Sequence, residues 1–313
     1  MKHRYFLTGA SGFVGSNIVR VLVSRGEEVH VLLRNGIPWR LTDLQKKITV
    51  HEGDILSSAL PRILADASPT VIFHLASFGA MPQEKDVDRI FDVNVGGITN
   101  LLSHLPKSVE LFVNTGSSSE YGIKDMPMDE DMTPEPVNDY GVAKASATLY
   151  ALKVAATSAF PIVTLRLFSP FGPYEQKTRF IPHVISSMLH NEQLELSSPS
   201  FVRDFVYIDD VVAAYLSCVT QENTVAGHII NIGSGKQHSL GDVVDAVSGL
   251  LGELPRVSWD ENRKQGRQVE PKIWQADITK AKKLLDWKPA HTLKLGLKKT
   301  IDWMKEHTEL YEN

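Results

Sequence analysis

The stretch "YFLTGASGFVG", residues 5–15, carries a short apolar run into three closely spaced glycines. An apolar run of this length that ends at glycine is typical of a buried strand, and residues 13–25 then have the apolar spacing of a helix. A strand, a glycine-rich turn and a helix in this order form the first part of a parallel βαβ unit. The opening of the chain therefore predicts an α/β fold.

The glycines themselves suit a particular ligand. In such turns Gly9 allows a tight turn, Gly12 allows the backbone to approach a pyrophosphate, and Gly15 allows close packing of helix on strand. The N-terminus of the helix, with Phe13 and Val14 in its first turn, then faces the phosphates. Glycine-rich turns without a ligand are also common, but the position at the first βα turn favours dinucleotide binding.

The first half of the chain continues this alternation. Six apolar runs are predicted strands, and the amphipathic segments between them are predicted helices. Alternating strands and helices form a doubly wound, Rossmann-like parallel sheet with helices on both faces. The predicted strands are residues 5–8, 28–33, 48–53, 70–76, 109–116 and 161–168, and the predicted helices are residues 13–25, 57–66, 84–104 and 138–158.

The pattern changes after about residue 169, where prolines interrupt it. We expect a smaller, mostly helical C-terminal domain that binds substrate over the carboxyl edge of the sheet. The chain is predicted to return to the first domain once, through residues 209–219 and 228–233. The predicted domains are residues 1–168 plus about 205–235 for the dinucleotide, and residues 169–204 plus 236–313 for the substrate.

The composition excludes several classes of partner. Lys and Arg total 33 against 37 acidic residues, so the net charge of −4 predicts no general attraction to nucleic acid or to membranes. The single cysteine, Cys218, excludes an intrachain disulfide, and no Cys/His cluster has metal-site spacing. Early glycines rule out the apolar core of a signal peptide, and no apolar run is long enough to span a membrane. We therefore expect a cytoplasmic protein without a metal site.

The end of the second predicted strand, "HVLLRN" (30–35), indicates which dinucleotide binds. NAD-binding folds usually place an acidic residue there to hold the ribose 2′-hydroxyl, but this chain has Leu33 and then Arg34. Arg34, with help from Arg40, is predicted to pair with the 2′-phosphate of NADP. The alternative is an ordinary surface arginine, with NAD as the cofactor. Asp54 and Ile55, at the end of the third strand, are expected to contact the adenine.

The segment "DYGVAK", residues 139–144, places Tyr140 and Lys144 one helical turn apart, so both side chains project from one face. Taken alone, this spacing also fits a solvated surface pair. Beside a nicotinamide the pair acquires a role, because an ammonium about 4 Å from a phenolate stabilises it by about 4 kcal/mol at an effective dielectric of about 20. That energy equals roughly three pKa units before desolvation is subtracted. Tyr140 is then predicted to exchange a proton with a sugar or alcohol oxygen, and Lys144 to hold the nicotinamide ribose.

The fifth predicted strand ends in "NTGSSSEYG", residues 114–122, which supplies hydroxyl groups at Ser117, Ser118 and Ser119. A serine cluster after a strand is, by itself, more typical of turn chemistry than of catalysis. Combined with the tyrosine and the lysine, it becomes a candidate for the group that steadies the reacting oxygen.

These segments together resemble the extended short-chain dehydrogenase/reductase family, which contains nucleotide-sugar epimerases, dehydratases and reductases. The motifs run in order along nearly the whole chain and include "TGASGFVG" (8–15), "HLAS" (74–77), "SSSEYG" (117–122), "YGVAK" (140–144) and "RDFVYIDDV" (203–211). The resemblance implies that Ser117, Tyr140 and Lys144 are catalytic. It also implies that Leu75, Ala76 and Ser77 line the cofactor, and that Asn94 positions water or the lysine.

The resemblance further implies a nucleotide-diphosphate sugar as substrate. Arg203 and Arg267 match residues that hold the diphosphate, and Arg179 lies where the nucleotide is often met. Arginine suits this task because its planar fork binds phosphate oxygens in pairs. Ser118 and Ser169 are further candidates for substrate contact, although Ser169 replaces the usual asparagine of the family in "RLFSPFGP" (166–173).

The residues after the catalytic serine separate the reactions of the family. Sugar 4,6-dehydratases typically have Thr-Asp-Glu there, whereas this chain has Ser117-Ser118-Ser119, with Glu120 one step out of register. The segment is closer to that of GDP-4-keto-6-deoxymannose reductases, and residues 180–212 are similar to 4-ketoreductases of the CDP-abequose synthase type. Because Arg34 favours NADPH, we predict reduction of the C4 ketone of a nucleotide-linked 4-keto-6-deoxyhexose.

Two alternatives stay open. The first is an NAD-dependent nucleotide-sugar C4 epimerase, which keeps one cofactor and recycles it. The second is a non-catalytic redox-sensing or RNA-binding relative, a class that usually lacks the tyrosine or the lysine. The resemblance also implies a homodimer formed through helices 84–104 and 138–158.

Overall fold

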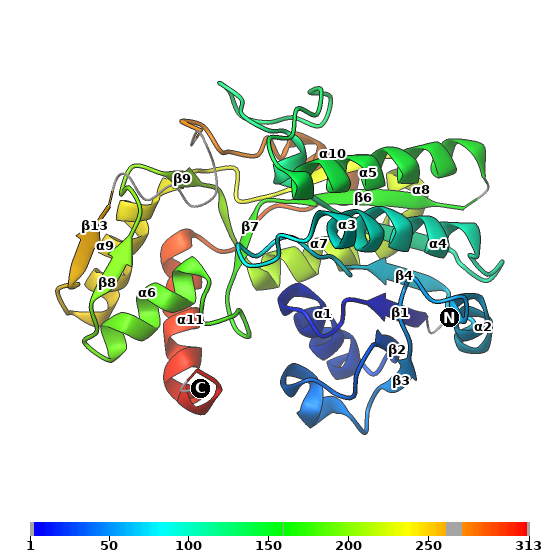
Figure 1. Cartoon of the computed structure of the whole chain (residues 1–313), viewed down its shortest axis with the longest axis horizontal. Helices are drawn as coiled ribbons and strands as arrows, with labels where there is room; N and C mark the ends of the chain where they lie inside the picture. Colours follow the sequence, from blue (N-terminus) through cyan, green and yellow to red (C-terminus); the bar gives the residue numbers. More distant parts are fainter. Residues whose placement is uncertain (1–2, 159, 261–270, 312–313) are drawn as a thin grey trace.

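The computed structural model describes residues 3–158, 160–260 and 271–311. Its centre is a seven-stranded sheet whose neighbouring strands all pair in parallel, in the order β11-β6-β5-β4-β1-β2-β3 (Figure 1). The predicted α/β fold with a doubly wound parallel sheet is thus confirmed. The strands are β1 (Arg4–Thr8), β2 (Glu28–Leu33), β3 (Thr49–Glu52), β4 (Val71–His74), β5 (Leu111–Ser117), β6 (Ile162–Leu167) and β11 (Ile229–Ile232).

Helices cover both faces of the sheet. Because successive residues of a strand point to opposite faces, Tyr5 and Leu7 of β1 join one apolar core while Phe6 joins the other. The first core includes residues of α1 and α7, and the second includes residues of α2, α4 and α5. These helices are α1 (Phe13–Ser24), α2 (Leu60–Ala67), α4 (Gly97–Ser103), α5 (Asp139–Thr157) and α7 (Ile208–Thr220).

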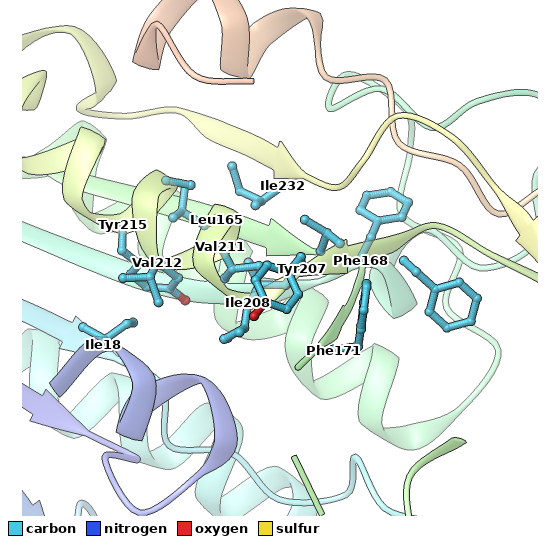
Figure 2. Packing of buried hydrophobic residues seen from close by; sticks show 14 of the residues in the cluster. Ile18, Leu165, Phe168, Phe171, Tyr207, Ile208, Val211, Val212, Tyr215 and Ile232 are labelled. Carbon is cyan, nitrogen blue, oxygen red and sulfur yellow. The ribbon is translucent and has the colours of Figure 1, made fainter. Parts of the chain in front are cut away.

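The first core continues beyond the sheet. Figure 2 shows Ile18 of α1 near Tyr215 of α7, with Phe171 and Tyr207 further along the same cluster. The rings of Phe171 and Tyr207 meet edge to face, with centroids 5.7 Å apart. One continuous apolar cluster therefore links the sheet to the C-terminal part of the chain. Phe171 and Tyr207 end the two strands of a small parallel ladder, β7 (Ser169–Phe171) and β10 (Phe205–Tyr207).

Much of the C-terminal part forms a second lobe, which lies to the left in Figure 1 and carries α6, α9 and α11. It also contains two-stranded sheets that the sequence does not predict, because strands of two or three residues are too short to show a period. The division into two domains stays a prediction. No helix in the described ranges is both long and apolar enough to cross a bilayer. The remaining elements are α6 (Phe180–Leu189), α8 (Glu222–Val225), α9 (Leu240–Leu251), α10 (Thr279–Leu285), α11 (Leu293–Glu306), β8 (Leu194–Leu196), β9 (Val202–Arg203), β12 (His238–Ser239), β13 (Val257–Trp259), and the 3-10 turns η1 (Trp39–Leu44), η3 (Ser118–Glu120) and η4 (Thr308–Leu310).

The segment predicted as one helix over residues 84–104 is interrupted. The short helix α3 (Val87–Phe91) passes into a π-helical turn, η2 (Asp92–Gly96), before α4 begins. At the end of this turn the amide of Gly97 donates to the carbonyl of Asp92, five residues earlier. Such turns are rare and often mark functional sites.

Candidate active site

The glycine turn after β1 is packed too tightly for larger residues. Gly9 has φ +70°, and a Cβ there would lie 2.5 Å from the amide nitrogen of Ala76. A Cβ on Gly15 would lie 2.3 Å from the carbonyl oxygen of Gly9. Leu75 and Ala76, which follow β4, therefore form the opposite wall of the turn. The shape fits the glycine roles that the sequence predicts.

The N-terminus of α1 is open to an anion. Gly12 occupies the N-cap position, no side chain caps it, and no acidic residue lies in the first turn of this helix. Phe13 and Val14 begin the helix and are partly buried, whereas Ser77 on the facing loop is exposed. Because backbone amides at a helix N-terminus attract phosphate, the turn fits the pyrophosphate of a dinucleotide.

A pocket of about 420 Å³ lies beside the ends of β2 and β3. Arg34 and Asp54 line it as predicted, together with Asn35, Glu52, Gly53 and Arg89. Ile55 does not line this pocket, because its side chain is buried against α4. The volume is that of a typical small-molecule site, and its place fits the adenosine half of a dinucleotide.

Arg40 is not placed to help Arg34. Its side chain is buried, its Nε donates to the carbonyl of Tyr174 at 2.8 Å, and its Nη1 donates to the carbonyl of Ser11 at 3.4 Å. It does not line the pocket that holds Arg34. The prediction that Arg40 assists at the 2′-phosphate is therefore wrong, since its side chain is buried outside this pocket and two of its donors bind backbone carbonyls.

The predicted catalytic residues meet where β5 ends and α5 begins. Asn138 caps α5 by accepting the amide of Gly141 at 2.7 Å, which fixes the first turn that carries Tyr140. Lys144 lies one turn later and is almost fully buried. Ser117, the last residue of β5, lies close enough to the Tyr140 side chain to affect its pKa. The structure thus brings Ser117 and Tyr140 together and places Lys144 on the same helix.

Burial is the largest influence on the pKa values of Tyr140 and Lys144. Burial raises the pKa of Tyr140 to about 12, and the nearby Ser117 hydroxyl only partly opposes the rise. Burial also lowers the pKa of Lys144 to about 8, against the opposing effect of the Glu120 carboxylate. The expectation that Lys144 lowers the pKa of Tyr140 below its usual value is therefore wrong for the protein alone. Desolvation is the largest influence on the pKa of each of the two groups.

Glu120 has a structural role. Its Oε1 accepts the amide of Ser117 at 2.7 Å, and its Oε2 accepts Nε of Arg166 at 2.7 Å. The side chains of Glu120 and Arg166 are 0% and 2% exposed, so this ion pair is removed from solvent. Through the amide of Ser117, the pair fixes the backbone at the end of β5. Both carboxylate oxygens of Glu120 therefore accept hydrogen bonds from groups within the protein.

Asn94 lies at the centre of the π-helical turn. Its Nδ2 donates to the carbonyl of Phe78 at 2.6 Å and to the carbonyl of Ile90 at 2.8 Å. Its Oδ1 is buried and has no hydrogen-bond partner among the described residues. An orphaned acceptor in this place fits the implied role of holding water or the lysine ammonium.

Of the predicted substrate residues, Ser118 follows β5, and the others lie in the C-terminal part. Arg179 precedes α6, with its Nε 3.6 Å from Oε1 of Glu175 and its charge near Tyr140. Arg203 donates to the carbonyl of Val202 and lies over the ring of Trp274. Ser118 is buried within η3, and the amide of Ser169 donates to the carbonyl of Asp204. Arg267 lies outside the described residues.

Three further residues belong to the site. Arg89 lines the adenosine pocket and stacks over the ring of Phe78, with its Cζ 4.4 Å from the ring centroid. Glu84 accepts the amides of Gly79 and Met81 and so shapes the loop beside Tyr140. Glu175 is buried next to Arg179. No local sequence motif distinguishes these residues from other charged positions of the chain.

The glycine turn, the pocket beside β2 and β3, and the Ser117–Tyr140–Lys144 group all lie within one matched family region. Residues 5–233 match the model of the "NAD dependent epimerase/dehydratase family". The chain belongs to this family. The resemblance to extended short-chain dehydrogenases/reductases is thus confirmed, and the matched residues span the whole parallel sheet.

Full-length relatives of this family member catalyse more than one reaction. A UDP-glucuronate 4-epimerase of Thermodesulfobacterium geofontis is 27% identical, and the alignment covers 99% of this chain and 98% of that protein. A GDP-6-deoxy-D-mannose reductase of Pseudomonas aeruginosa is 25% identical over 97% of this chain and 98% of that protein. A UDP-glucuronic acid 4-epimerase of Bacillus cereus, solved with UDP-glucuronic acid and NAD, superposes with a TM-score of 0.86. It is 27% identical and covers 97% of this chain and 99% of that one.

Proposed function

We propose that this family member is an NAD-dependent nucleotide-sugar epimerase that inverts C4 of the sugar. The observation that carries the proposal is that Ser117 and Tyr140 lie close together where β5 ends and α5 begins, while Ser117 and Arg166 engage the two carboxylate oxygens of Glu120. Such a site exchanges a proton with a sugar hydroxyl, whereas dehydration needs an additional free acid. The epimerases among the relatives support this reaction over the reductase that the sequence predicts.

The chain's own groups have defined tasks in this reaction. Tyr140 accepts the proton of the C4 hydroxyl and later returns it, and Ser117 hydrogen-bonds the same oxygen. A nicotinamide bound in this site would supply the reversible hydride transfer at C4. Inversion requires the returned hydrogen to reach the other face of the sugar, so the sugar must turn while its diphosphate stays bound. Arg179 and Arg203 are the described residues that we assign to the diphosphate.

The test is a substrate panel without added reductant. Purified protein is incubated with UDP-glucose, UDP-galactose and UDP-glucuronate, and the sugars are identified by proton NMR. We expect reversible interconversion at C4 in at least one pair, with no net change in reduced-nicotinamide absorbance. An unchanged sugar in every incubation contradicts the proposal.

A C4 reductase is the second candidate, favoured by Arg34 at the end of β2 and by the Pseudomonas relative. It would oxidise NADPH only in the presence of a nucleotide-linked 4-keto-6-deoxyhexose. The assay follows the loss of NADPH absorbance in parallel incubations with the GDP-, CDP-, dTDP- and UDP-linked forms. Loss of absorbance distinguishes reduction from epimerisation. A protein that binds dinucleotide and turns over neither panel would be the non-catalytic relative.

We also propose that the adenosine pocket accepts NADP as well as NAD. Arg34 and Arg89 both line it, and a charge-assisted hydrogen bond contributes about 1.5–3 kcal/mol. Arg34→Ala is therefore expected to raise the Kd for NADP about 10- to 100-fold and to change the Kd for NAD less than about 3-fold. Fluorescence titration measures both constants, with the exposed Arg25→Ala as control. An equal rise in Kd for NAD and NADP would show that Arg34 does not contact the 2′-phosphate.

We further propose a homodimer formed through α3 and α5. Val142 and Leu149, two helical turns apart on α5, are exposed, as is Val87 at the start of α3. Sedimentation should give about twice the 34.8 kDa chain mass, and Leu149→Arg should shift the protein toward the monomer. Leu254→Arg, at an exposed leucine elsewhere, is the control. A wild-type monomer at micromolar concentration contradicts the proposal.

A further inference from the structure

The loop Gly172–Glu175, which follows β7, is held by side chains from three different elements. Asn17 of α1, Arg40 of η1 and Tyr311 after η4 donate to three successive carbonyls of this loop, at 3.0, 2.8 and 2.9 Å. Tyr174 within it has φ 70°, a conformation that a non-glycine residue adopts at a cost. The loop is therefore fixed by both the N-terminal half and the C-terminal end of the chain.

The side chain of Glu175 is buried inside this fixed loop. It is 4% exposed, and its Oε2 has no hydrogen-bond partner among the described residues. Its Oε1 lies 3.6 Å from Nε of Arg179. The buried guanidinium of Arg40 also acts on it, and Nη1 of Arg40 donates to the carbonyl of Ser11 in the glycine turn. Glu175 is thus a shared counterion between the dinucleotide turn and the substrate arginine.

Arg179 itself reaches toward the reacting group. Its side chain is 40% exposed, and its contact with Glu175 uses Nε. Nη1 lies 3.8 Å from the sulfur of Met81, on the loop that Glu84 shapes beside Tyr140. The positive charge of Arg179 acts on Tyr140. The terminal nitrogens of Arg179 therefore lie at the entrance to the active site.

We propose that Glu175 is a positioning residue, which holds the Nε edge of Arg179 so that the terminal nitrogens of this guanidinium face the substrate diphosphate. The inference rests on the proposed function, in which arginines bind that diphosphate. A partly exposed arginine otherwise samples many rotamers, and a side chain ordered before binding loses less freedom when the ligand arrives. A guanidinium held by one edge still presents two donors to phosphate oxygens.

The arrangement makes substrate affinity depend on pH. Burial raises the pKa of Glu175 to about 7, with Arg179, the backbone of Gly172 and Arg40 opposing the rise. The groups that face it are Arg40, Arg179 and Tyr311, and Tyr311 stays neutral because burial raises its pKa. Below pH 7 Glu175 gains a proton and no longer holds Arg179 as an ion pair. Affinity is therefore expected to fall as the pH falls from 8 to 6.

The experiment uses the dinucleotide-loaded protein and UDP-glucose, whose diphosphate diester does not titrate in this range. Glu175→Gln is expected to raise the Kd and KM for UDP-glucose about 10-fold at pH 8 and to change kcat less than about 3-fold. The unaltered protein should lose about 5-fold in affinity between pH 8 and pH 6, because about a tenth of Glu175 is still ionised at pH 6, and the variant should stay flat. Lys177→Gln, an exposed change in the same segment, is the control.

A double variant separates positioning from general damage. If Glu175 acts through Arg179, adding Glu175→Gln to Arg179→Ala leaves the Kd of the single Arg179 variant unchanged. The inference is overturned if the two substitutions lower the affinity for UDP-glucose additively, or if Glu175→Gln leaves the Kd unchanged. Neither result contradicts the proposed function. Failure of the unaltered protein to bind any UDP-sugar overturns both. Thermal melting of each variant shows that the fold is retained.

Discussion

Replacing Tyr140 with phenylalanine is expected to lower kcat for C4 epimerisation by about 10³-fold, because general acid–base catalysis typically contributes 10²- to 10⁴-fold. The change removes one oxygen and keeps the ring, so the packing at the start of α5 is preserved. Ser117 then remains as a hydrogen-bond donor to the C4 oxygen, but no group accepts its proton. Kd values for NAD and for UDP-sugar should change less than about 3-fold.

A matched control lies on the same helix. Tyr150 is partly buried on α5, with the ammonium of Lys153 5.8 Å from its ring centroid, and it lies more than two turns from Tyr140. Tyr150→Phe should leave kcat within about 2-fold of the unaltered protein. Full activity in Tyr140→Phe would remove the tyrosine from the proposed chemistry and would require another base.

Breaking the buried Glu120–Arg166 pair is expected to have the largest effect on stability. Glu120→Gln removes the only carboxylate that faces Arg166 in the described structure, and Nη1 of Arg166 already lacks a hydrogen-bond partner there. An uncompensated buried charge typically costs about 3–5 kcal/mol in the free energy of unfolding. Denaturant unfolding followed by circular dichroism measures this loss. Activity should also fall, because the amide of Ser117 donates to the same carboxylate.

Two further variants isolate the cause. The double variant Glu120→Gln with Arg166→Met removes both charges and should recover part of the lost stability. Asp302→Asn breaks the exposed pair with Lys298 on α11 and should cost less than about 0.5 kcal/mol. A cost for Glu120→Gln no larger than that of Asp302→Asn would show that the buried pair contributes little.

Much of the central sheet could be predicted because its signals are local. A buried parallel strand is a continuous apolar run, so residues 28–33 coincide with β2 and residues 161–168 contain β6. The glycine turn and the one-turn spacing of Tyr140 and Lys144 are likewise read from neighbouring residues. The cofactor side of the site follows from these signals together with the family motifs.

The features that could not be predicted depend on residues far apart in the sequence. Glu120 and Arg166 are 46 positions apart, so nothing beside either residue indicates that they form a buried pair. Arg40 follows the second strand closely enough to suggest a phosphate ligand. Its Nε and Nη1 instead donate to backbone carbonyls of two other segments. The direction of the Tyr140 pKa shift depends on burial, which helical spacing alone does not measure. Whether the site reduces or epimerises its substrate could not be predicted either, because the residues that decide the reaction come from several segments.

The π-helical turn η2 makes the active site sensitive to deletions. A hydrogen bond that spans five residues, from Asp92 to Gly97, accommodates one residue more than the four-residue span of an α-helix. Deleting one residue between them would restore a regular helix and rotate one flank by about 100° relative to the other. The amide of Asn94 would then leave the carbonyls of Phe78 and Ile90. In this helix the number of residues matters as much as their identity, so length changes that surface loops tolerate would disable the site here.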